Sequence, residues 1–168
     1  MCGYVWPVLT PDLLRQVFEA IAGDYVGDLA FDVMYTHMLD YSEHSTWPRI
    51  HWRPATMGMN INVATATLAQ NATCEMWVLG QVDSDRSGNE VSQMHGQMSS
   101  LASLVLGRFC ELYVFDTTDF QGQALDLSFT GAPSFEPVWD AENMATGVRV
   151  TFTVQDNRNL GCTTAYFA

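Results

Sequence analysis

The sequence predicts an α+β fold, in which a mixed or antiparallel sheet with a long β-hairpin packs against two α-helices. Three observations predict it. Apolar residues recur at helical spacing in two separate segments, and a long β-compatible run forms two strands joined by a tight turn. The segment from Val148 to Val154 also alternates apolar and polar residues, which is the cleanest strand pattern in the chain.

The first helix is predicted over Pro11 to Ala22. Thr10 is a favourable N-cap, Pro11 suits the first helical position, and Gly23 is a natural stop. Five apolar residues then recur at helical spacing, namely Leu13, Leu14, Val17, Phe18 and Ile21. Strands are predicted over Leu29 to His37 and Trp47 to Arg53, separated by a polar loop from Asp40 to Thr46. Pro48 and Pro54 mark the edges of the second of these strands or place it at a sheet margin.

The long hairpin follows, with one strand from Met59 to Ala69, a turn at Gln70-Asn71, and a second strand from Ala72 to Val82. A polar bridge, Asp83 to Gly88, opens a helix near Asn89 that ends at Gly107 or Cys110. Its apolar stripe contains Val91, Met94, Met98, Leu101 and Val105. Packing of this stripe on the sheet is favoured over a methionine-rich partner groove, because helices usually bury such faces.

The C-terminal part is rich in strand patterns. Strands are predicted at Leu112 to Phe115, at Leu125 to Phe129 and, around Pro137, at Phe135 to Trp139. A length of 168 residues suits one domain over residues 1–168. We expect an N-terminal arm at residues 1–9 and a C-terminal tail at residues 157–168.

The composition argues against several partner classes. The net charge is −12, and all seven basic residues are arginines. A protein that grips nucleic acid or an anionic membrane surface needs a basic patch, which seven scattered arginines do not supply. The apolar runs are too short to span a bilayer. The first residues lack the pattern of a secretory signal.

No residue pattern predicts catalysis, a cofactor site or a metal site. The histidines lack the spacing of a helical zinc site. The segment Asp83 to Gly88 resembles the start of a calcium-binding loop, but Met94 stands where that loop requires a glutamate. Cys74 and Cys110 lie in apolar stretches and are predicted to be small buried hydrophobes. We therefore expect a protein that is not an enzyme.

Short patterns along the chain resemble a known family. They are the strand from Trp47 to Trp52, the turn into a helix from Val78 to Val91, and the segment from Pro137 to Val154. The last of these contains Asp140, Asn143, Thr146 and Gly147. Together with the element order, these patterns resemble the tail-terminator-like and neck proteins of tailed bacteriophages, over about Leu9 to Cys162.

This resemblance implies a structural virion protein, assembled in the host cytoplasm, that forms a ring, commonly a hexamer. The ring terminates the tail tube and joins it to the head connector. The implied partners are further copies of the chain and the adjacent neck, connector and tail tube proteins. The genome passes through the lumen without specific binding, and no membrane is involved. The residues we expect at the interfaces lie in the hairpin, the polar loop and the tail: Asn60, Asn62, Gln70, Asn71, Glu43, His44, Arg158 and Asn159.

Two other functions stay open at this point. A β-rich module that binds a small ligand or a carbohydrate is favoured by the five tryptophans, Trp6, Trp47, Trp52, Trp77 and Trp139, because aromatic platforms bind sugars. Trp77, however, is expected to be buried, and aromatic residues are more often core. A metal-assisted enzyme would require a tightly bound metal ion.

Overall fold

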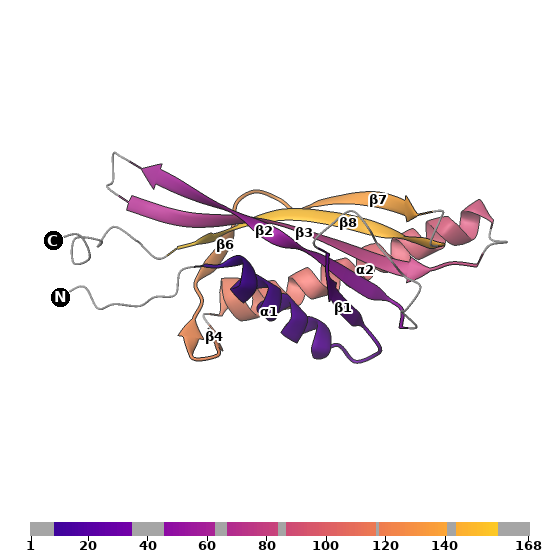
Figure 1. Ribbon diagram of the computed structural model, residues 1–168, viewed down its shortest axis with the longest axis horizontal. Coiled ribbons are helices and arrows are strands. Elements are labelled where there is room, and N and C mark those ends of the chain that lie inside the picture. The colour runs from indigo at the N-terminus through magenta and orange to yellow at the C-terminus, as the bar shows by residue number, and fades with distance from the viewer. Residues whose placement is uncertain are drawn as a thin grey trace.

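The computed structural model describes residues 9–34, 46–62, 67–83, 87–116, 118–140 and 144–157. Two helices and eight strands make up most of these residues (Figure 1). In chain order they are α1 (Pro11–Gly23), β1 (Ala30–Val33), β2 (Arg49–Asn62), β3 (Thr67–Gln81), α2 (Gly88–Cys110), a π-helical turn (Glu111–Phe115), β4 (Asp119–Phe120), β5 (Gln123–Ala124), β6 (Leu127–Phe129), β7 (Ser134–Asp140) and β8 (Ala145–Asp156).

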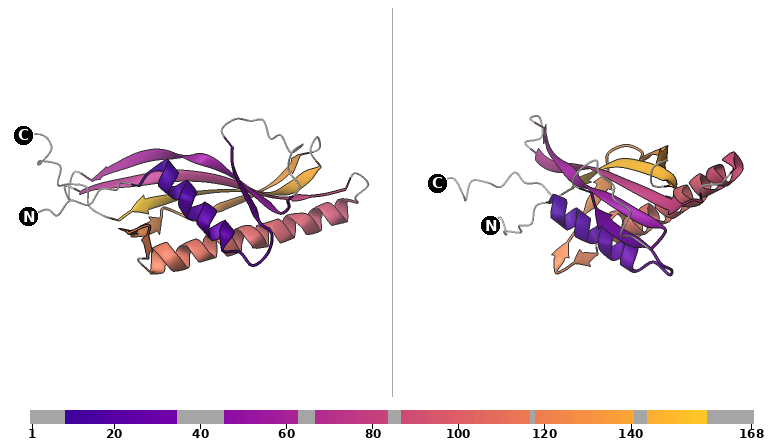
Figure 2. Two further views of the ribbon diagram at one scale, coloured as in Figure 1. Left: turned by 60° about the horizontal axis from the view of Figure 1, so that its bottom comes forward. Right: turned by 45° about the vertical axis from the view of Figure 1, so that its right-hand side comes forward.

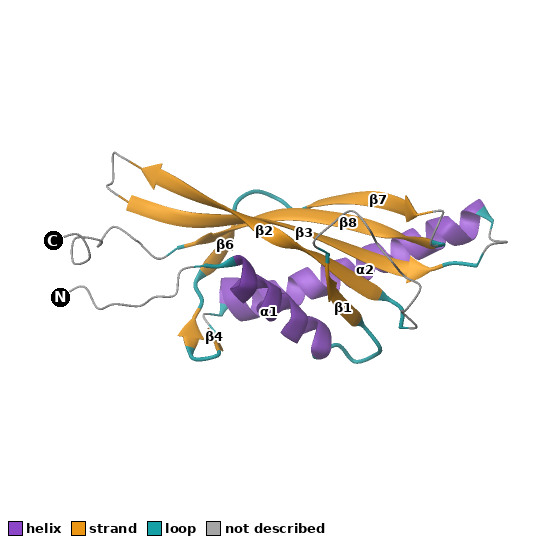
Figure 3. Cartoon of the chain, viewed as in Figure 1, coloured by secondary structure: helices purple, strands orange, loops and turns teal. Residues whose placement is uncertain are grey.

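The architecture is a two-layer α+β sandwich, which confirms the predicted fold class. Six strands form one sheet in the order β1-β2-β3-β8, with β6 and β7 both pairing with the far edge of β8. Only β1 runs parallel to its neighbour, and every other pair is antiparallel. Both helices lie against the same face of the sheet (Figures 2 and 3). We call this the covered face and the opposite one, which carries neither helix, the open face.

The helix α1 begins as its sequence predicts. The Thr10 side chain accepts a hydrogen bond from the backbone N–H of Leu13 at 3.1 Å, and Pro11 occupies the first turn. The residues predicted for its apolar face are all buried. The helix therefore packs as expected, with that face on β2 and on α2.

The helix α2 begins at the polar bridge, where the Glu90 carboxylate accepts a hydrogen bond from the backbone N–H of Ser87 at 2.8 Å. Met98, Leu101 and Val105 are buried in the core and Met94 packs against it, which confirms the core role predicted for these four residues of the stripe; Val91 is only half-buried. The strand predicted at Leu112 to Phe115 is wrong. This segment continues α2 as a π-helical turn, because Tyr113 stays on the buried side and packs against Phe109.

An aromatic cluster fills the space between the layers. The ring of Phe18 on α1 stacks on Trp52 of β2 at 4.7 Å and on Phe109 of α2 at 4.9 Å. Phe152 of β8 completes the cluster, at 5.4 Å from Phe18. Because each ring comes from a different element, this cluster is the contact that joins both helices to the centre of the sheet.

The hairpin register differs from the predicted one. The last pair before the tip joins Asn62 to Thr67, so the turn predicted at Gln70-Asn71 is wrong and both residues lie within β3. The two strands predicted separately at Trp47 to Arg53 and from Met59 are one continuous strand, β2. Pro54 falls where the register shifts between Arg53 and Thr56, beyond the end of β1, so its missing N–H costs no ladder hydrogen bond there.

Candidate assembly interface

The distal part of the hairpin projects beyond the rest of the fold (Figure 1). The edge strand β1 ends where Val33 pairs with Trp52, and the pairing of β8 with β3 ends where Gln155 meets Asn71. Four further pairs, from Met59–Gln70 to Asn62–Thr67, therefore have no third strand beside them among the described residues. We call residues 59–62 and 67–70 the hairpin extension. An isolated two-stranded ribbon is marginal in water, so this segment would gain stability from a partner.

The hairpin extension belongs to an uncharged stretch of the chain. No Asp, Glu, Lys or Arg occurs from Pro54 to Cys74, although the whole chain carries a net charge of −12. The stretch is bounded on the two strands by Arg53 and Glu75, which form an ion pair at 3.2 Å. Electrostatic recognition by an oppositely charged partner is thus excluded for this stretch, because it offers no charge to recognise.

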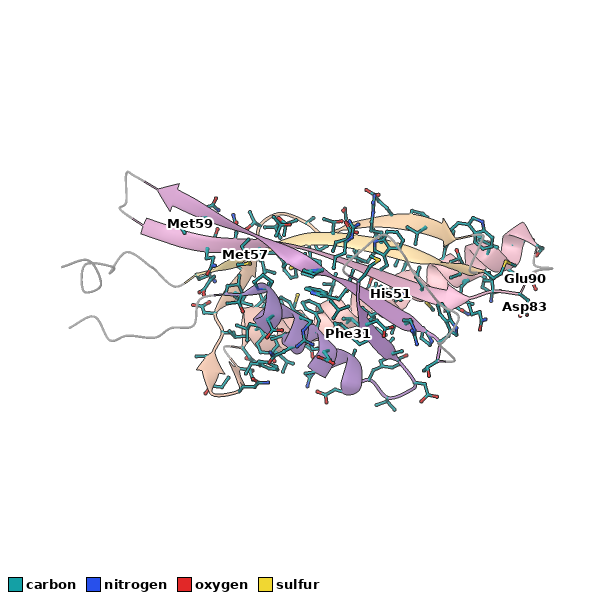
Figure 4. All side chains as sticks on the ribbon, in the orientation of Figure 1. Phe31, His51, Met57, Met59, Asp83 and Glu90 are labelled. Carbon is teal, nitrogen blue, oxygen red and sulfur yellow. The ribbon has the colours of Figure 1, made fainter. Side chains whose placement is uncertain are left out.

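The covered-face side of the hairpin is apolar. Met57 is partly buried against the core, whereas Met59, two residues farther out, is 57% exposed (Figure 4). Gln70 pairs with Met59, and its side-chain oxygen is shielded from solvent but accepts no hydrogen bond from the described residues. The helices therefore cover this face as far as Met57 and leave Met59, the next residue on this face of β2, exposed.

The open-face side of the hairpin is polar. The Asn60 amide donates a hydrogen bond to the Gln155 side chain at 3.4 Å, and the Asn71 side chain lies over Gly58. Of the residues predicted for the interface, Asn60 and Asn71 thus come together on this side, whereas Gln70 belongs to the other side. Asn62 lies in the last backbone pair of β2. Glu43, His44, Arg158 and Asn159 lie outside the described residues.

The open face of the central sheet is charge-balanced. Arg49 pairs with Asp32 at 2.8 Å, Arg53 with Glu75 at 3.2 Å, and Arg149 with Glu136. Hydrogen bonding to Glu136 raises the pKa of Arg149. Three of the chain's seven arginines are therefore used to neutralise acids on this face, and the acidic surplus lies elsewhere.

Aromatic side chains lie on both faces of the sheet. His51 faces the opposite side from Ile50 and Trp52, because successive side chains of a strand alternate between the two faces. The prediction that Trp77 is buried is wrong, because Trp77 pairs with His51 on the open face and is half-buried. Its indole N–H donates to Glu75 at 2.8 Å. Among the tryptophans that the structure describes, the fully buried one is Trp52, on the face that the helices cover.

A second apolar surface lies at the other end of the sheet. On β7, Phe135 and Trp139 pair with Val150 and Thr146, so both belong to the covered-face side. They lie at the edge of that face, and Trp139 is 50% exposed. Sequence reasoning missed this surface, although apolar residues at alternate positions around Pro137 are the pattern of an edge strand.

A histidine fixes β7 to α2 beside this surface. Thr146 is fully buried, and its hydroxyl donates to the Val138 carbonyl oxygen at 3.0 Å. The Nε2 atom of His95 lies 2.6 Å from the Thr146 hydroxyl and 3.1 Å from the same carbonyl oxygen. In the tautomer that carries its proton on Nε2, His95 donates to both oxygens. The contact ties β7, through its Val138 carbonyl, to α2.

The described residues show little that could perform chemistry. Among them, no group of three or more His, Cys, Asp or Glu side chains is placed to hold a metal ion. Burial raises the pKa of the Cys74 thiol far above its ordinary value, and it also raises the pKa of Cys110, with a further contribution from Glu111. Neither thiol is therefore prone to form the nucleophilic thiolate.

The helix α2 with its π-helical turn, Gly88–Phe115, is long and apolar enough to cross a membrane by length and composition alone. A core helix passes the same test, and six side chains of α2 are buried in this fold. They are Met98, Leu101, Ala102, Val105, Leu106 and Phe109.

The chain was compared with protein families and with curated proteins. No family model matches it, and no curated protein matches it.

Proposed function

We propose that the protein is a structural component of a tailed-bacteriophage virion. In this proposal it forms a ring, a hexamer by the family resemblance, in the neck or at the head-proximal end of the tail. The ring terminates the tail tube and joins it to the head connector. The resemblance of the segments at Trp47 to Trp52, Val78 to Val91 and Pro137 to Val154 supports the family assignment.

The hairpin extension is the observation that carries the assembly part of the proposal. It is long, uncharged and two-stranded, and it presents Met59 without a cover among the described residues. A segment of this kind gains most from packing on another protein surface, because apolar burial is the main favourable term in association. A heterologous contact of one fixed geometry closes into a ring when its rotation allows closure.

The net charge of −12 and the absence of lysine also support a role around a DNA conduit. A wall of like charge does not trap the passing genome, since the binding of DNA depends on neutralising its phosphates. The proposal therefore expects no retardation of double-stranded DNA in a gel at low salt. A mobility shift at micromolar protein would contradict this part of the proposal.

A shortened hairpin tests the assembly role. Gly58 and Asn71 are direct partners in the register, so residues 59–70 can be replaced by a two-residue Asn-Gly turn that closes the same ladder. Native mass spectrometry of the wild-type chain should show one closed oligomer, and the shortened variant should be a folded monomer. Assembly of the shortened variant into the same oligomer would rule out the hairpin as the assembly element.

The position in the particle needs a separate measurement. Cryo-electron microscopy of the intact virion should place the chain as a ring between the head connector and the tail tube. A wild-type chain that stays monomeric and binds glycans on an array would instead favour the carbohydrate-binding alternative. Trp77, half-buried on the open face, would then be the first residue to substitute.

A further inference from the structure

Two apolar surfaces that no described residue covers lie on the same side of the sheet but far apart along it. The first is Met59 on the hairpin extension, and the second is the pair Phe135 and Trp139 on β7. Met59 pairs with Gln70 of β3, and Trp139 pairs with Thr146, which in turn pairs with Gly80 of β3. Gln70 and Gly80 are ten residues apart along β3, which corresponds to about 33 Å. The two surfaces therefore cannot bury each other within one chain.

The placement of two different surfaces far apart on the molecule favours a second copy of the chain as the partner. Figure 4 shows Met59 near one end of the molecule and Glu90, at the start of α2, near the other. Two different surfaces at opposite ends allow head-to-tail contact, in which each copy gives its hairpin and receives another. A hairpin-to-hairpin contact would leave Trp139 and Phe135 exposed in every copy.

The charge distribution favours the same partner. Copies that carry a net charge of −12 repel one another wherever acidic surfaces meet. The stretch from Pro54 to Cys74 has no charge, whereas Asp140 follows Trp139 on β7 and Glu90 lies at the same end of the molecule (Figure 4). The uncharged hairpin is thus the part of one copy that can approach this acidic end of another copy at low electrostatic cost. Nucleic acid finds no cation on the hairpin to bind.

We propose that the hairpin extension of one copy docks through its Met59 side on the Phe135–Trp139 surface of the next copy. This inference rests on the proposed ring and identifies the two surfaces that meet in it. Trp139 is the anchor of the contact, since tryptophan contributes most when a partner desolvates it. The contact by His95 and Thr146 keeps the edge strand that carries Trp139 in place before docking.

Three glutamate variants with the same change in charge test this contact. They are Met59→Glu on the hairpin, Trp139→Glu on β7, and Leu104→Glu on α2 as the control. Leu104 is 62% exposed and belongs to neither surface. Native mass spectrometry at 10 μM protein should show monomers for the first two variants and the wild-type oligomer for Leu104→Glu. The far-ultraviolet circular dichroism of all three should match that of the wild-type chain.

Mixing the two monomeric variants supplies the decisive measurement. The Trp139→Glu chain keeps a working hairpin, and the Met59→Glu chain keeps a working β7 surface. A head-to-tail contact therefore predicts a 1:1 heterodimer that grows no further. A mixture that stays monomeric would overturn the inference, and so would a Trp139→Glu chain that assembles like the wild type.

The outcomes separate this inference from the function on which it rests. If the wild-type chain forms a closed oligomer but Trp139→Glu does so too, the ring stands and the assignment of β7 as the receiving surface fails. If the wild-type chain forms no oligomer alone and none with tail or connector components, the proposed function itself fails.

Discussion

The same two strands, β2 and β3, make up two regions of opposite character. Near the helices, Trp52 and Met76 pair with each other and are fully buried. Seven residues farther along β2, Met59 pairs with Gln70 and is mostly exposed. Both regions carry a methionine on the covered-face side, and the register is continuous beyond the shift at Arg53. The helix layer, rather than strand composition, therefore decides which part of the hairpin is core and which part is available to a partner.

The largest expected difference between the two regions is in thiol reactivity. Cys74 lies in the covered region, and burial raises the pKa of its thiol. In the native state at pH 8, an alkylating reagent should reach Cys74 only when the fold opens. We expect Cys74 to be labelled about 1000-fold or more slowly than in the urea-unfolded chain. Peptide mass mapping measures the extent of labelling at Cys74. Labelling of Cys74 at the unfolded rate would show that the helix layer does not seal the core.

Methionine substitutions compare the two regions directly. Met76→Ala removes a fully buried side chain and should lower the free energy of unfolding by about 2–5 kcal/mol. Met59→Ala removes an exposed one on the same side of the sheet and should change that free energy by less than about 0.5 kcal/mol. Urea denaturation at a concentration where the chain is monomeric measures both. Equal costs would mean that the extension is part of the folding core.

Glycine substitutions make the comparison on the open face. A Cβ at Gly147 would lie 2.0 Å from the Val78 carbonyl oxygen, whereas a Cβ at Gly58 would meet only the Asn71 side chain, at 2.2 Å from its oxygen. Backbone cannot move aside as a side chain can. We expect Gly147→Ala to cost about 1–3 kcal/mol and Gly58→Ala about 0.5 kcal/mol or less, measured by thermal denaturation. A reversed order would contradict the backbone spacing between β3 and β8.

The smallest effect on stability is expected at Asp12, on the solvent side of α1, which belongs to the helix layer. Hydrogen bonds from Arg15 and Gln16 lower the pKa of Asp12 below its ordinary value of 3.8. A carboxylate with a lowered pKa contributes stability that is present above the unfolded pKa and is lost as the pH falls through the folded value. Asp12→Asn should therefore lower the urea midpoint slightly at pH 7 and leave it unchanged at pH 2. An equal loss at both pH values would assign the effect to something other than the charge.

Local patterns in the sequence predict the parts of this fold that local physics determines. Three features depend only on residues that are close together in the sequence: the N-cap at Thr10, the apolar stripe of α2 and the alternation of β8. The hairpin tip was misplaced because the run from Thr56 to Val82 contains no strong turn residues at the true tip, so long-range register decides its position. The run Leu112 to Phe115 is too short to distinguish a strand from a helix extension by periodicity.

The candidate interface was predicted only in part for the same reason. The hairpin and Asn60 were anticipated, since a long strand pair is visible in the sequence. Which face the helices cover is not visible in the sequence, so the sequence predicts Trp77 in the core and assigns Trp139 to a strand and to a possible sugar platform but not to an assembly interface. Both errors concern the pairing of distant elements, which a single sequence does not encode in neighbouring residues.

The continuity of β2 and β3 from the core into the extension has a mechanical consequence. Tension applied to the hairpin along its strands would load the eleven register pairs between β3 and β8, from Asn71–Gln155 to Gln81–Ala145, in parallel. Bonds loaded in this shearing geometry must fail together, whereas bonds peeled from an end fail one at a time. A projecting arm anchored in this way resists being drawn out of its own domain more strongly than a loop of equal length.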